Sequence, residues 1–409
     1  MKNLLSQRAR LLKPSPTLAM ANKARELSAL GHDVVNLTVG EPDWATFEVA
    51  AKAGIEAIQN GLTKYTPAAG IPELRQAIAT QFSKELGVDY KPSQVIVGVG
   101  AKFVIYALLQ MLINPGDEVI VPSPYWVSYP AMVELASGKV KIIECGEKEN
   151  YKLSPAALKK NISEKSKVLI LCSPSNPTGL LYSKAELLAL AEVIRQFPNL
   201  IVISDDIYNR LVFTGEMAPH LLNVAPDLKD RVIPVNGASK SYSMTGWRVG
   251  WALGPQELMT AVADFLSQST SNVATPSQMA TLAAIEKGEP ELKQAVQKLN
   301  QKCQWMLGEL ENMTFIEVIP PQGAFYFWLD VRGLIGKTYH AKGVGDLTAA
   351  KKIQSSKDVA QILLEDYFVV LVPGEEFGSD GYLRMSFASA EKNLQKGLDR
   401  LHEFEEQIR

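Results

Sequence analysis

The chain has 409 residues, of which 46% are hydrophobic and 21% are charged, and this composition is typical of a globular protein rather than a disordered or fibrous one. Its formal net charge is −2 and its pI is about 6.2, so it has no strong positive field to attract nucleic acid or an acidic membrane surface. Its three cysteines form no C-x-x-C pair and no histidine stands at metal-ligand spacing, which argues against a disulfide framework and a zinc site. We therefore expect two domains in a reducing compartment, with no metal, nucleic-acid or membrane partner.

The N-terminal segment MKNLLSQRARLLKPSP places basic residues among its apolar positions. It lacks the continuous apolar run of about 7–15 residues that a signal peptide requires. Elsewhere no segment approaches the roughly 18 uninterrupted apolar residues of a membrane-spanning helix. We interpret the segment as mature sequence and predict a cytoplasmic protein.

Short apolar runs recur through the middle of the chain and predict the strands of one sheet. Most are separated by segments with helical periodicity, such as AKFVIYALLQMLI and SKAELLALAEVIRQF. Because strands that are apolar on both faces need helices on both sides, the pattern indicates a mostly parallel α/β sheet. The runs lie at 95–97, 119–121, 168–171, 200–203, 232–235 and 249–253.

After about residue 295 a long charged helical pattern is followed by alternating strand and helix patterns, which predict a smaller α+β domain. No linker rich in Ser, Gly or Pro separates independently moving parts. We place the large domain at residues 45–295 and the small domain at residues 1–44 and 296–409.

Polar residues follow several predicted strands, where the ligand crevice of a parallel sheet lies. They are Asn176 in SPSNPTG, Asp205 and Tyr208 in DDIYNR, and Lys240 in NGASK. Singly, each has a structural alternative: a turn residue, a helix N-cap, a core aromatic and a surface lysine, respectively. Together they predict a site at one edge of the sheet.

The stretch VGVGAKF places Gly98, Gly100 and Ala101 between a strand and a helix. Free amides and the positive end of the helix dipole suit an anion there, although the full G-x-G-x-x-G and P-loop signatures are absent. Lys240 lies in a neutral stretch with Arg248 as its nearest charged neighbour, and such surroundings favour the unprotonated amine. Together with the Asp205 carboxylate, these features predict pyridoxal phosphate (PLP) bound to Lys240 as a Schiff base.

Eight motifs span nearly the whole chain, in the order GEPD, KYTPAAGIPELR, PSPYWVSYP, SPSNPTG, SDDIY, NGASKSYSMTGWRVG, PQGAFY and YLRMSFA. Together they resemble the landmarks of class I aminotransferases of PLP fold type I, above all those of the bacterial-type aspartate/prephenate branch. The resemblance implies a large domain with a mostly parallel seven-stranded sheet flanked by helices, a smaller α+β domain, PLP as cofactor, and a homodimer with shared active sites.

The resemblance implies that Lys240 carries the cofactor and, once released, shuttles the substrate proton. Asp205 would pair with the pyridine nitrogen, and Asn176 and Tyr208 would hydrogen-bond the phenolic oxygen of the ring. Trp126 would stack on the ring beside the substrate, or it is an ordinary core aromatic.

The phosphate would be bound by Arg248 and by the backbone of Gly100, Ala101 and Lys102. Tyr65 in KYTP would reach the phosphate of the neighbouring subunit. Ser239 is a further candidate for a phosphate contact.

For the substrate, the resemblance implies that Arg384 grips the α-carboxylate in a two-pronged salt bridge, with support from Asn176 and Gly40. Lys102, together with Ser15 and Thr17, would bind the distal carboxylate of a dicarboxylic substrate. A lysine at a helix N-terminus opposes the helix dipole, and an incoming carboxylate would account for it.

Four residues depart from the branch: Phe103 stands where Gln is usual, Trp44-Ala45 where Phe-Asp is usual, and Cys172 where Asn is common. None alters the lysine, the acid or the phosphate groups. The Gly-rich segment 332–346 resembles an insertion of this branch, or it is a surface loop.

These features predict an aminotransferase that converts aspartate and 2-oxoglutarate into oxaloacetate and glutamate, and that also accepts prephenate or another oxo acid. The alternatives within the fold are an aromatic or aliphatic aminotransferase and a lyase. A nicotinamide dehydrogenase would need an acidic residue after the second strand, where Pro122 and Ser123 stand. A non-catalytic regulator is the remaining alternative.

Overall fold

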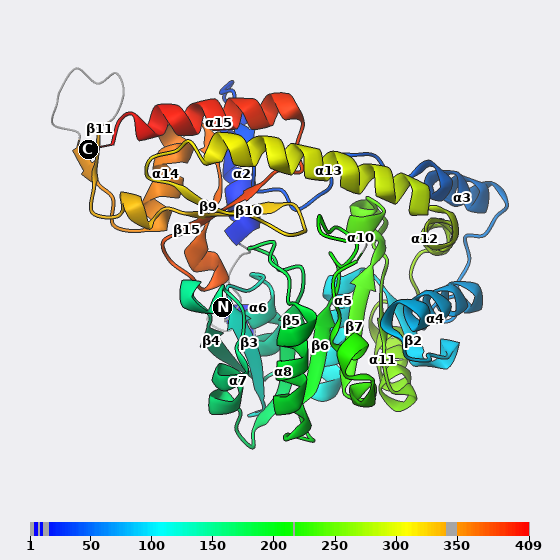
Figure 1. The fold of residues 1–409 in the computed structure, drawn as a ribbon. Coiled ribbons are helices and arrows are strands. Elements are labelled where there is room, and N and C mark those ends of the chain that lie inside the picture. Colours follow the sequence, from blue (N-terminus) through cyan, green and yellow to red (C-terminus); the bar gives the residue numbers. More distant parts are fainter. Residues whose placement is uncertain (1–3, 7–8, 11–15, 216, 341–349, 409) are drawn as a thin grey trace.

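The computed structural model describes residues 4–6, 9–10, 16–215, 217–340 and 350–408. In Figure 1 a large sheet with its helices forms the lower part of the molecule, and a smaller group of strands and helices lies above it. The cavity described below lies between elements of these two parts.

A seven-stranded sheet forms the centre of the lower part, in the order β2-β8-β7-β6-β5-β3-β4. β8 runs antiparallel to both of its neighbours and the other pairs are parallel, so the predicted mostly parallel sheet is confirmed. Every residue of β2, β7 and β8 is buried, which explains their unbroken apolar runs. The strands are β2 (Val95–Gly98), β3 (Glu118–Ser123), β4 (Lys139–Glu144), β5 (Ser166–Cys172), β6 (Ile201–Asp205), β7 (Val232–Gly237) and β8 (Gly250–Leu253).

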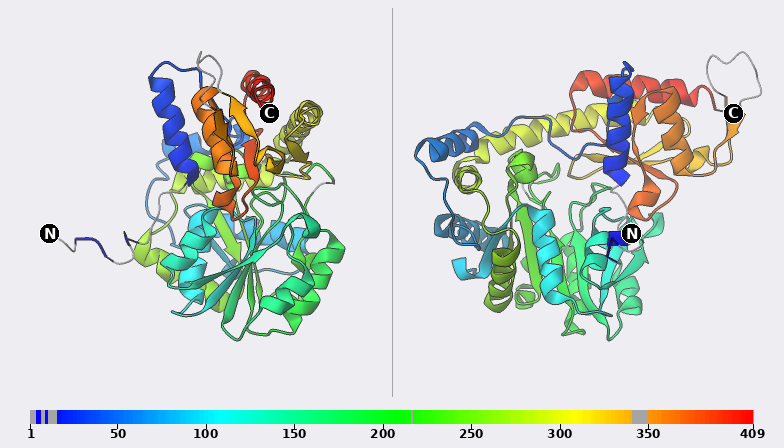
Figure 2. Two further views of the ribbon diagram at one scale, coloured as in Figure 1. Left: turned by 90° about the vertical axis from the view of Figure 1, so that its left-hand side faces the viewer. Right: turned by 180° about the vertical axis from the view of Figure 1, so that it is seen from behind.

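Helices cover both faces of this sheet (Figure 2). Helix α8 begins with a capping box, in which Ser183 and Glu186 exchange side-chain and backbone hydrogen bonds. The helices between residues 48 and 287, of which α3 packs against α12 rather than on the sheet, are α3 (Glu48–Gln59), α4 (Pro72–Leu86), α5 (Ala101–Leu112), α6 (Tyr129–Leu135), α7 (Pro155–Asn161), α8 (Lys184–Arg195), α9 (Leu221–Val224), α10 (Ala238–Ser241), α11 (Gln256–Ser269) and α12 (Thr275–Lys287).

The upper part contains an antiparallel sheet in the order β14-β15-β10-β9. Both ends of the chain contribute to this part, because β1 pairs in parallel with β13, with Val35 opposite Val369. Its elements are α2 (Pro16–Ala29), β1 (Val35–Asn36), α13 (Glu289–Leu310), β9 (Glu317–Ile319), β10 (Tyr326–Asp330), β11 (Thr338–His340), β12 (Ala350–Lys352), α14 (Ser356–Asp366), β13 (Val369–Val370), β14 (Val372–Pro373), β15 (Tyr382–Ser386) and α15 (Glu391–Glu405).

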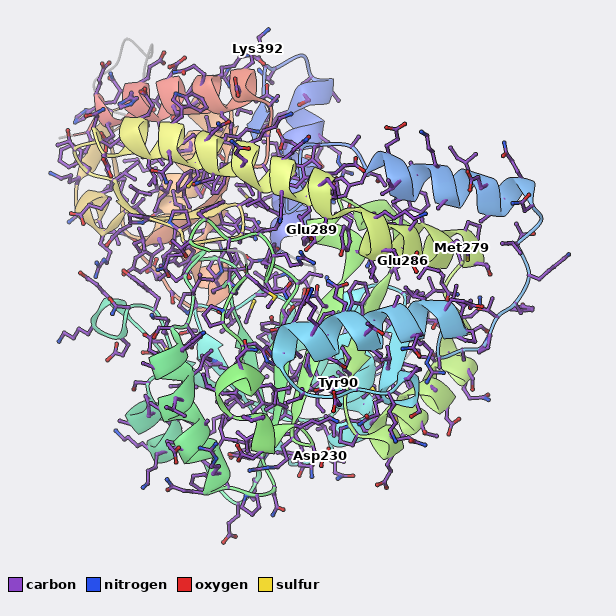
Figure 3. All side chains as sticks on the ribbon, turned by 45° about the vertical axis from the view of Figure 1, so that its right-hand side comes forward. Tyr90, Asp230, Met279, Glu286, Glu289 and Lys392 are labelled. Atoms are coloured by element: carbon purple, nitrogen blue, oxygen red, sulfur yellow. The ribbon has the colours of Figure 1, made fainter. Side chains whose placement is uncertain are left out.

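The 22-residue helix α13 runs from the lower part into the upper part, beside α15 (Figure 1). Figure 3 shows Glu289 at its start and Lys392 in α15. Arg210 binds both Glu289 and Glu85, the latter at 3.2 Å, and so ties the loop after β6 to the beginning of this helix. The proposed domain boundary at 295/296 falls inside α13, so one continuous helix would belong to both domains.

Candidate active site

The carboxyl ends of the central strands bring the predicted residues to one cavity of about 650 Å³. Asp205 ends β6, Lys240 lies in α10 directly after β7, and Asn176 follows β5. The lining comprises Arg25, Asn36, Thr38, Val39, Gly40, Glu41, Ala101, Lys102, Trp126, Val127, Ser128, Tyr129, Cys172, Asn176, Asp205, Ile207, Tyr208, Ser239, Lys240, Thr245, Arg248, Tyr326 and Arg384.

Lys240 is partly buried at the cavity wall, and desolvation of its amine lowers the pKa to about 8. Arg248 and Arg384 lower the pKa further, while Glu41 and Asp205 oppose the shift. The amine donates a hydrogen bond to the carbonyl of Gly40. The amine therefore loses its proton at a lower pH than an exposed lysine does.

Asp205 is 4% exposed, and burial raises the pKa of its carboxyl group to about 6. Two donors favour the ionised form: the Tyr129 hydroxyl lies 2.6 Å from Oδ2, and the Ile207 amide lies 3.3 Å from Oδ1. The carboxylate thus stands at the cavity wall with both oxygens oriented by neighbours.

Arg384 is buried without a carboxylate partner among the described residues. Its guanidinium donates to Asn176 Oδ1 at 3.0 Å and to the carbonyl of Thr38 at 2.7 Å. It lies against the rings of Tyr326 and Phe377, with centroid distances of 4.4 and 5.0 Å. Its Nε has no hydrogen-bond partner in the described part of the chain. A buried cation in this state favours an incoming carboxylate.

The turn between β2 and α5 forms a seat for an anion. Gly100 adopts φ 93°, and the Arg248 guanidinium lies directly against it: a Cβ at Gly100 would come within 2.3 Å of Nη2. Arg248 is held by the carbonyls of Thr245 and Val99, at 2.7 and 3.4 Å. The first amides of α5, those of Ala101 and Lys102, lack the intrahelical acceptors that later amides have.

Lys102 and Trp126 lie together at the cavity wall, with the lysine Nζ 4.9 Å from the indole centroid. Burial lowers the pKa of Lys102, and Arg248 lowers it further. Two phenols complete the wall, since the hydroxyls of Tyr208 and Tyr326 are 2.9 Å apart.

Four predicted residues are not placed in the lining of this cavity, and one of them, Gly100, directly precedes the lining residue Ala101. Tyr65 is 90% exposed and absent from the lining. Ser15 and the side chain of Thr17 lie outside the described residues. Ser239 is 7% exposed and lines the cavity.

Residues outside the sequence-based prediction also line the cavity. Tyr129 and Tyr326 lie within the motifs PSPYWVSYP and PQGAFY, so those motifs carried a signal for them. Glu41 lies in GEPD. Arg25 in α2 belongs to no motif, and only its place in the fold reveals it.

A larger cavity, of about 1090 Å³, lies between residues 43–47, α13 and α15 and contains no predicted site residue. Nowhere in the described ranges do three His, Cys, Asp or Glu side chains gather as metal ligands. Among these same residues, no helix combines the length and apolarity needed to cross a bilayer.

The cavity fits PLP. An anion seat at Gly100 and Arg248 would take its phosphate, the Lys240 amine its aldehyde and the Asp205 carboxylate its ring nitrogen. The unpaired Arg384 Nε leaves room for the carboxylate of an amino acid.

Comparisons with known proteins agree with this geometry. The family model "Aminotransferase class I and II" matches residues 32–401. A probable aspartate/prephenate aminotransferase of Rickettsia bellii is 42% identical over 399 residues, which cover 98% of each chain. An aspartate/prephenate aminotransferase of Nitrosomonas europaea is 39% identical over 97% of this chain and 98% of that protein.

Solved structures match equally well. The aspartate aminotransferase of Rhizobium meliloti has a TM-score of 0.94 at 34% identity, with 99% of each chain covered. The aspartate aminotransferase of Thermus thermophilus with maleate has a TM-score of 0.89 at 38% identity, covering 98% of this chain and 99% of that one. The chain therefore belongs to the class I and II aminotransferases, PLP-dependent enzymes of fold type I that move amino groups between amino acids and oxo acids.

Proposed function

We propose that this aminotransferase converts aspartate and 2-oxoglutarate into oxaloacetate and glutamate, and that it also uses prephenate. The observation that carries the proposal is the charge of the cavity: besides Arg384, the cations Lys102 and Arg25 line it without a hydrogen-bonded or ion-paired partner among the described residues. A substrate with a second carboxylate would supply one. Relatives named as aspartate and aspartate/prephenate aminotransferases, one of them solved with the dicarboxylate maleate, support this substrate class.

PLP, when bound, draws electrons away from the substrate α-carbon. In our proposal Asp205 would keep the ring nitrogen cationic, Tyr208 and Asn176 would hydrogen-bond the phenolic oxygen, and Trp126 would cover the ring. Arg384 binds the substrate α-carboxylate. Lys240, with its pKa near 8, takes the proton from the α-carbon once its amine is free.

The phosphate contacts of Gly100, Ala101, Lys102 and Arg248 are part of the same proposal. We also propose a homodimer in which Tyr65 reaches the phosphate of the neighbouring subunit, because this phenol is exposed and lies outside its own cavity. The cytoplasmic location and the division into residues 45–295 and 1–44 with 296–409 remain proposals as well.

Borohydride reduction of the protein loaded with PLP tests the centre of the proposal. The mass of a phosphopyridoxyl group should appear on the peptide that contains Lys240. Lys240→Ala should abolish this label, while Lys102→Ala should retain it. Label on another lysine would contradict the assigned role.

A panel of amino donors against 2-oxoglutarate, oxaloacetate and prephenate tests the substrates. We expect aspartate and glutamate to react fastest. Lys102→Ala should raise the KM for these dicarboxylates far more than the KM for alanine. A preference for aromatic or aliphatic donors would instead support the alternative aminotransferase.

A further inference from the structure

The Tyr129 hydroxyl makes the shortest hydrogen bond to the Asp205 carboxylate, which is proposed to face the ring nitrogen of PLP. The hydroxyl donates to Asp205 Oδ2 at 2.6 Å, and neither residue is more than 4% exposed. A hydroxyl bound to a carboxylate at this distance forms a charge-assisted hydrogen bond, which is stronger than a bond between neutral groups. The contact joins α6 to the end of β6, 76 positions apart in the chain.

Asp205 depends on such a donor to stay ionised. Burial alone pushes the pKa of the carboxyl group upward, and the Tyr129 hydroxyl is the strongest of the groups that oppose this shift. The Ile207 amide and Lys240 act in the same direction, whereas Asp206 acts against them.

Other protonated groups near Asp205 have hydrogen-bond partners of their own. The Cys172 thiol, on the adjacent strand β5 in register with Asp205, donates to the carbonyl of Pro174 at 3.3 Å. Burial raises the pKa of this thiol and of the phenols of Tyr129 and Tyr208, so all three keep their protons at neutral pH. Tyr129 therefore remains a donor throughout the working pH range.

The position of Tyr129 ties the acid to the wall of the cavity. Tyr129 begins α6, its amide donates to the carbonyl of Trp126 at 3.0 Å, and the two rings meet edge to face at 5.3 Å. The turn from Trp126 to Tyr129 thus carries both the indole proposed to cover the PLP ring and the hydroxyl that binds Asp205.

We propose that Tyr129 is a positioning residue for amino transfer: its hydroxyl orients the Asp205 carboxylate and keeps it ionised. This inference rests on the proposed role of Asp205.

The test compares Tyr129→Phe with Tyr182→Phe in the holoenzyme. Tyr182 is the matched control, because it is another buried phenol, and its hydroxyl accepts a hydrogen bond from the Leu153 amide at 2.8 Å, away from Asp205. For Tyr129→Phe we expect the acid limb of the kcat/KM profile to move upward by about one pH unit. We also expect kcat at neutral pH to fall about 10-fold to 100-fold, with the KM for the amino donor changed less than about twofold.

A spectroscopic titration gives a readout beyond activity. The pH midpoint of the visible cofactor absorption should move in Tyr129→Phe and stay in place in Tyr182→Phe. In an Asp205→Ala background, Tyr129→Phe should cause little further change in PLP affinity, because the two groups act as one unit.

If Tyr129→Phe does not fold, 3-fluorotyrosine at position 129 keeps the shape and strengthens the donor. The acid limb should then move downward. An acid limb that stays in place in the folded phenylalanine variant, or in the fluorotyrosine protein, would overturn the inference. Wild-type protein that transfers no amino group would refute the proposed function instead.

Discussion

At the scale of single residues, burial accounts for the chemistry of the site. The same desolvation lowers the pKa of Lys240 to about 8 and raises that of Asp205 to about 6. Both shifts favour the neutral form of the group and bring both pKa values close to neutral pH. Burial of these two groups therefore both adjusts their pKa values for catalysis and lowers the free energy of unfolding of the protein.

Lys240→Met should stabilise the apoprotein at pH 7. The pKa of Lys240 is lower in the folded chain than its ordinary value of 10.5, so the unfolded chain binds more protons between pH 8 and 10.5. The cost of holding the ammonium is therefore present below pH 8 and disappears as the pH rises to 10.5. The shift corresponds to about 3 kcal/mol at pH 7.

Urea unfolding from pH 7 to 10.5 measures this difference. Lys23→Met, at an exposed lysine that pairs with Glu26 at 3.4 Å, is the control and should change little. A gain for Lys240→Met that does not shrink with rising pH would contradict the assignment.

Arg25→Ala should raise the KM for dicarboxylic substrates by about fivefold, because an exposed ion pair contributes about 1 kcal/mol at most. The KM for alanine should be unchanged. Lys23→Ala removes a cation from the same helix, but one outside the cavity lining, and should have no effect. Equal increases for alanine and aspartate would remove Arg25 from the distal site.

At the scale of elements, the anion seat depends on how closely β8 approaches α5. A Cβ on Gly250 would lie 2.1 Å from the Ala101 amide nitrogen and 2.4 Å from the Gly100 carbonyl carbon. No atom can occupy that space. Strand β8, which donates no side chain to the phosphate, therefore fixes the turn that would bind it.

Gly250→Ala should accordingly displace the start of α5. We expect weaker PLP binding and a loss of about 1–3 kcal/mol in the free energy of unfolding. Gly308→Ala is the control, since a Cβ there meets nothing within 4 Å, and in the interior of α13 it should stabilise by up to about 1 kcal/mol. Equilibrium dialysis of PLP and chemical denaturation measure both effects, and unchanged PLP affinity in Gly250→Ala would contradict this account.

Six of the seven strands of the large sheet could be predicted from the sequence, because they are buried on both faces. β4 could not, since Lys139, Lys141 and Glu144 interrupt its apolar residues. It is the edge strand beside β3, where one side of the ladder is open and charged residues are tolerated. Asn176, Asp205 and Lys240 could be expected at one edge of the sheet, because each ends or follows one of these predictable strands.

Residues that reach the site from elsewhere were harder to predict. Arg25 lies in a helix of the upper part, so its neighbours across the cavity depend on how that part packs. The Tyr129–Asp205 contact joins two motifs that were each visible in the sequence, but their pairing required the register of α6 against the sheet.

At the scale of the whole molecule, the proposed dimer should allow two defective subunits to complement each other. A Lys240→Ala subunit lacks the reactive amine, and a Tyr65→Ala subunit lacks the phenol proposed to act across the interface. In a mixed dimer the intact Lys240 of one subunit faces the intact Tyr65 of the other, so one site is complete.

Activity of the mixed sample should therefore exceed that of either parent after subunit exchange. The reference is a hybrid of a wild-type subunit with a subunit that carries both Lys240→Ala and Tyr65→Ala, because neither of its sites has both residues intact. If Tyr65 acted within its own subunit, or if the protein were monomeric in sedimentation, mixing would bring no gain.

The hydrogen bond from Lys240 to the Gly40 carbonyl has a further consequence. Gly40 belongs to the N-terminal segment that adds β1 to the upper part, whereas Lys240 follows a strand of the lower sheet. The Lys240 amine can donate this hydrogen bond, which joins the two parts of the molecule, or it can bind PLP covalently, but one nitrogen does not do both. PLP binding should therefore break this hydrogen bond. Amide hydrogen exchange around residues 38–41 should then become faster in the PLP-bound enzyme than in the apoprotein.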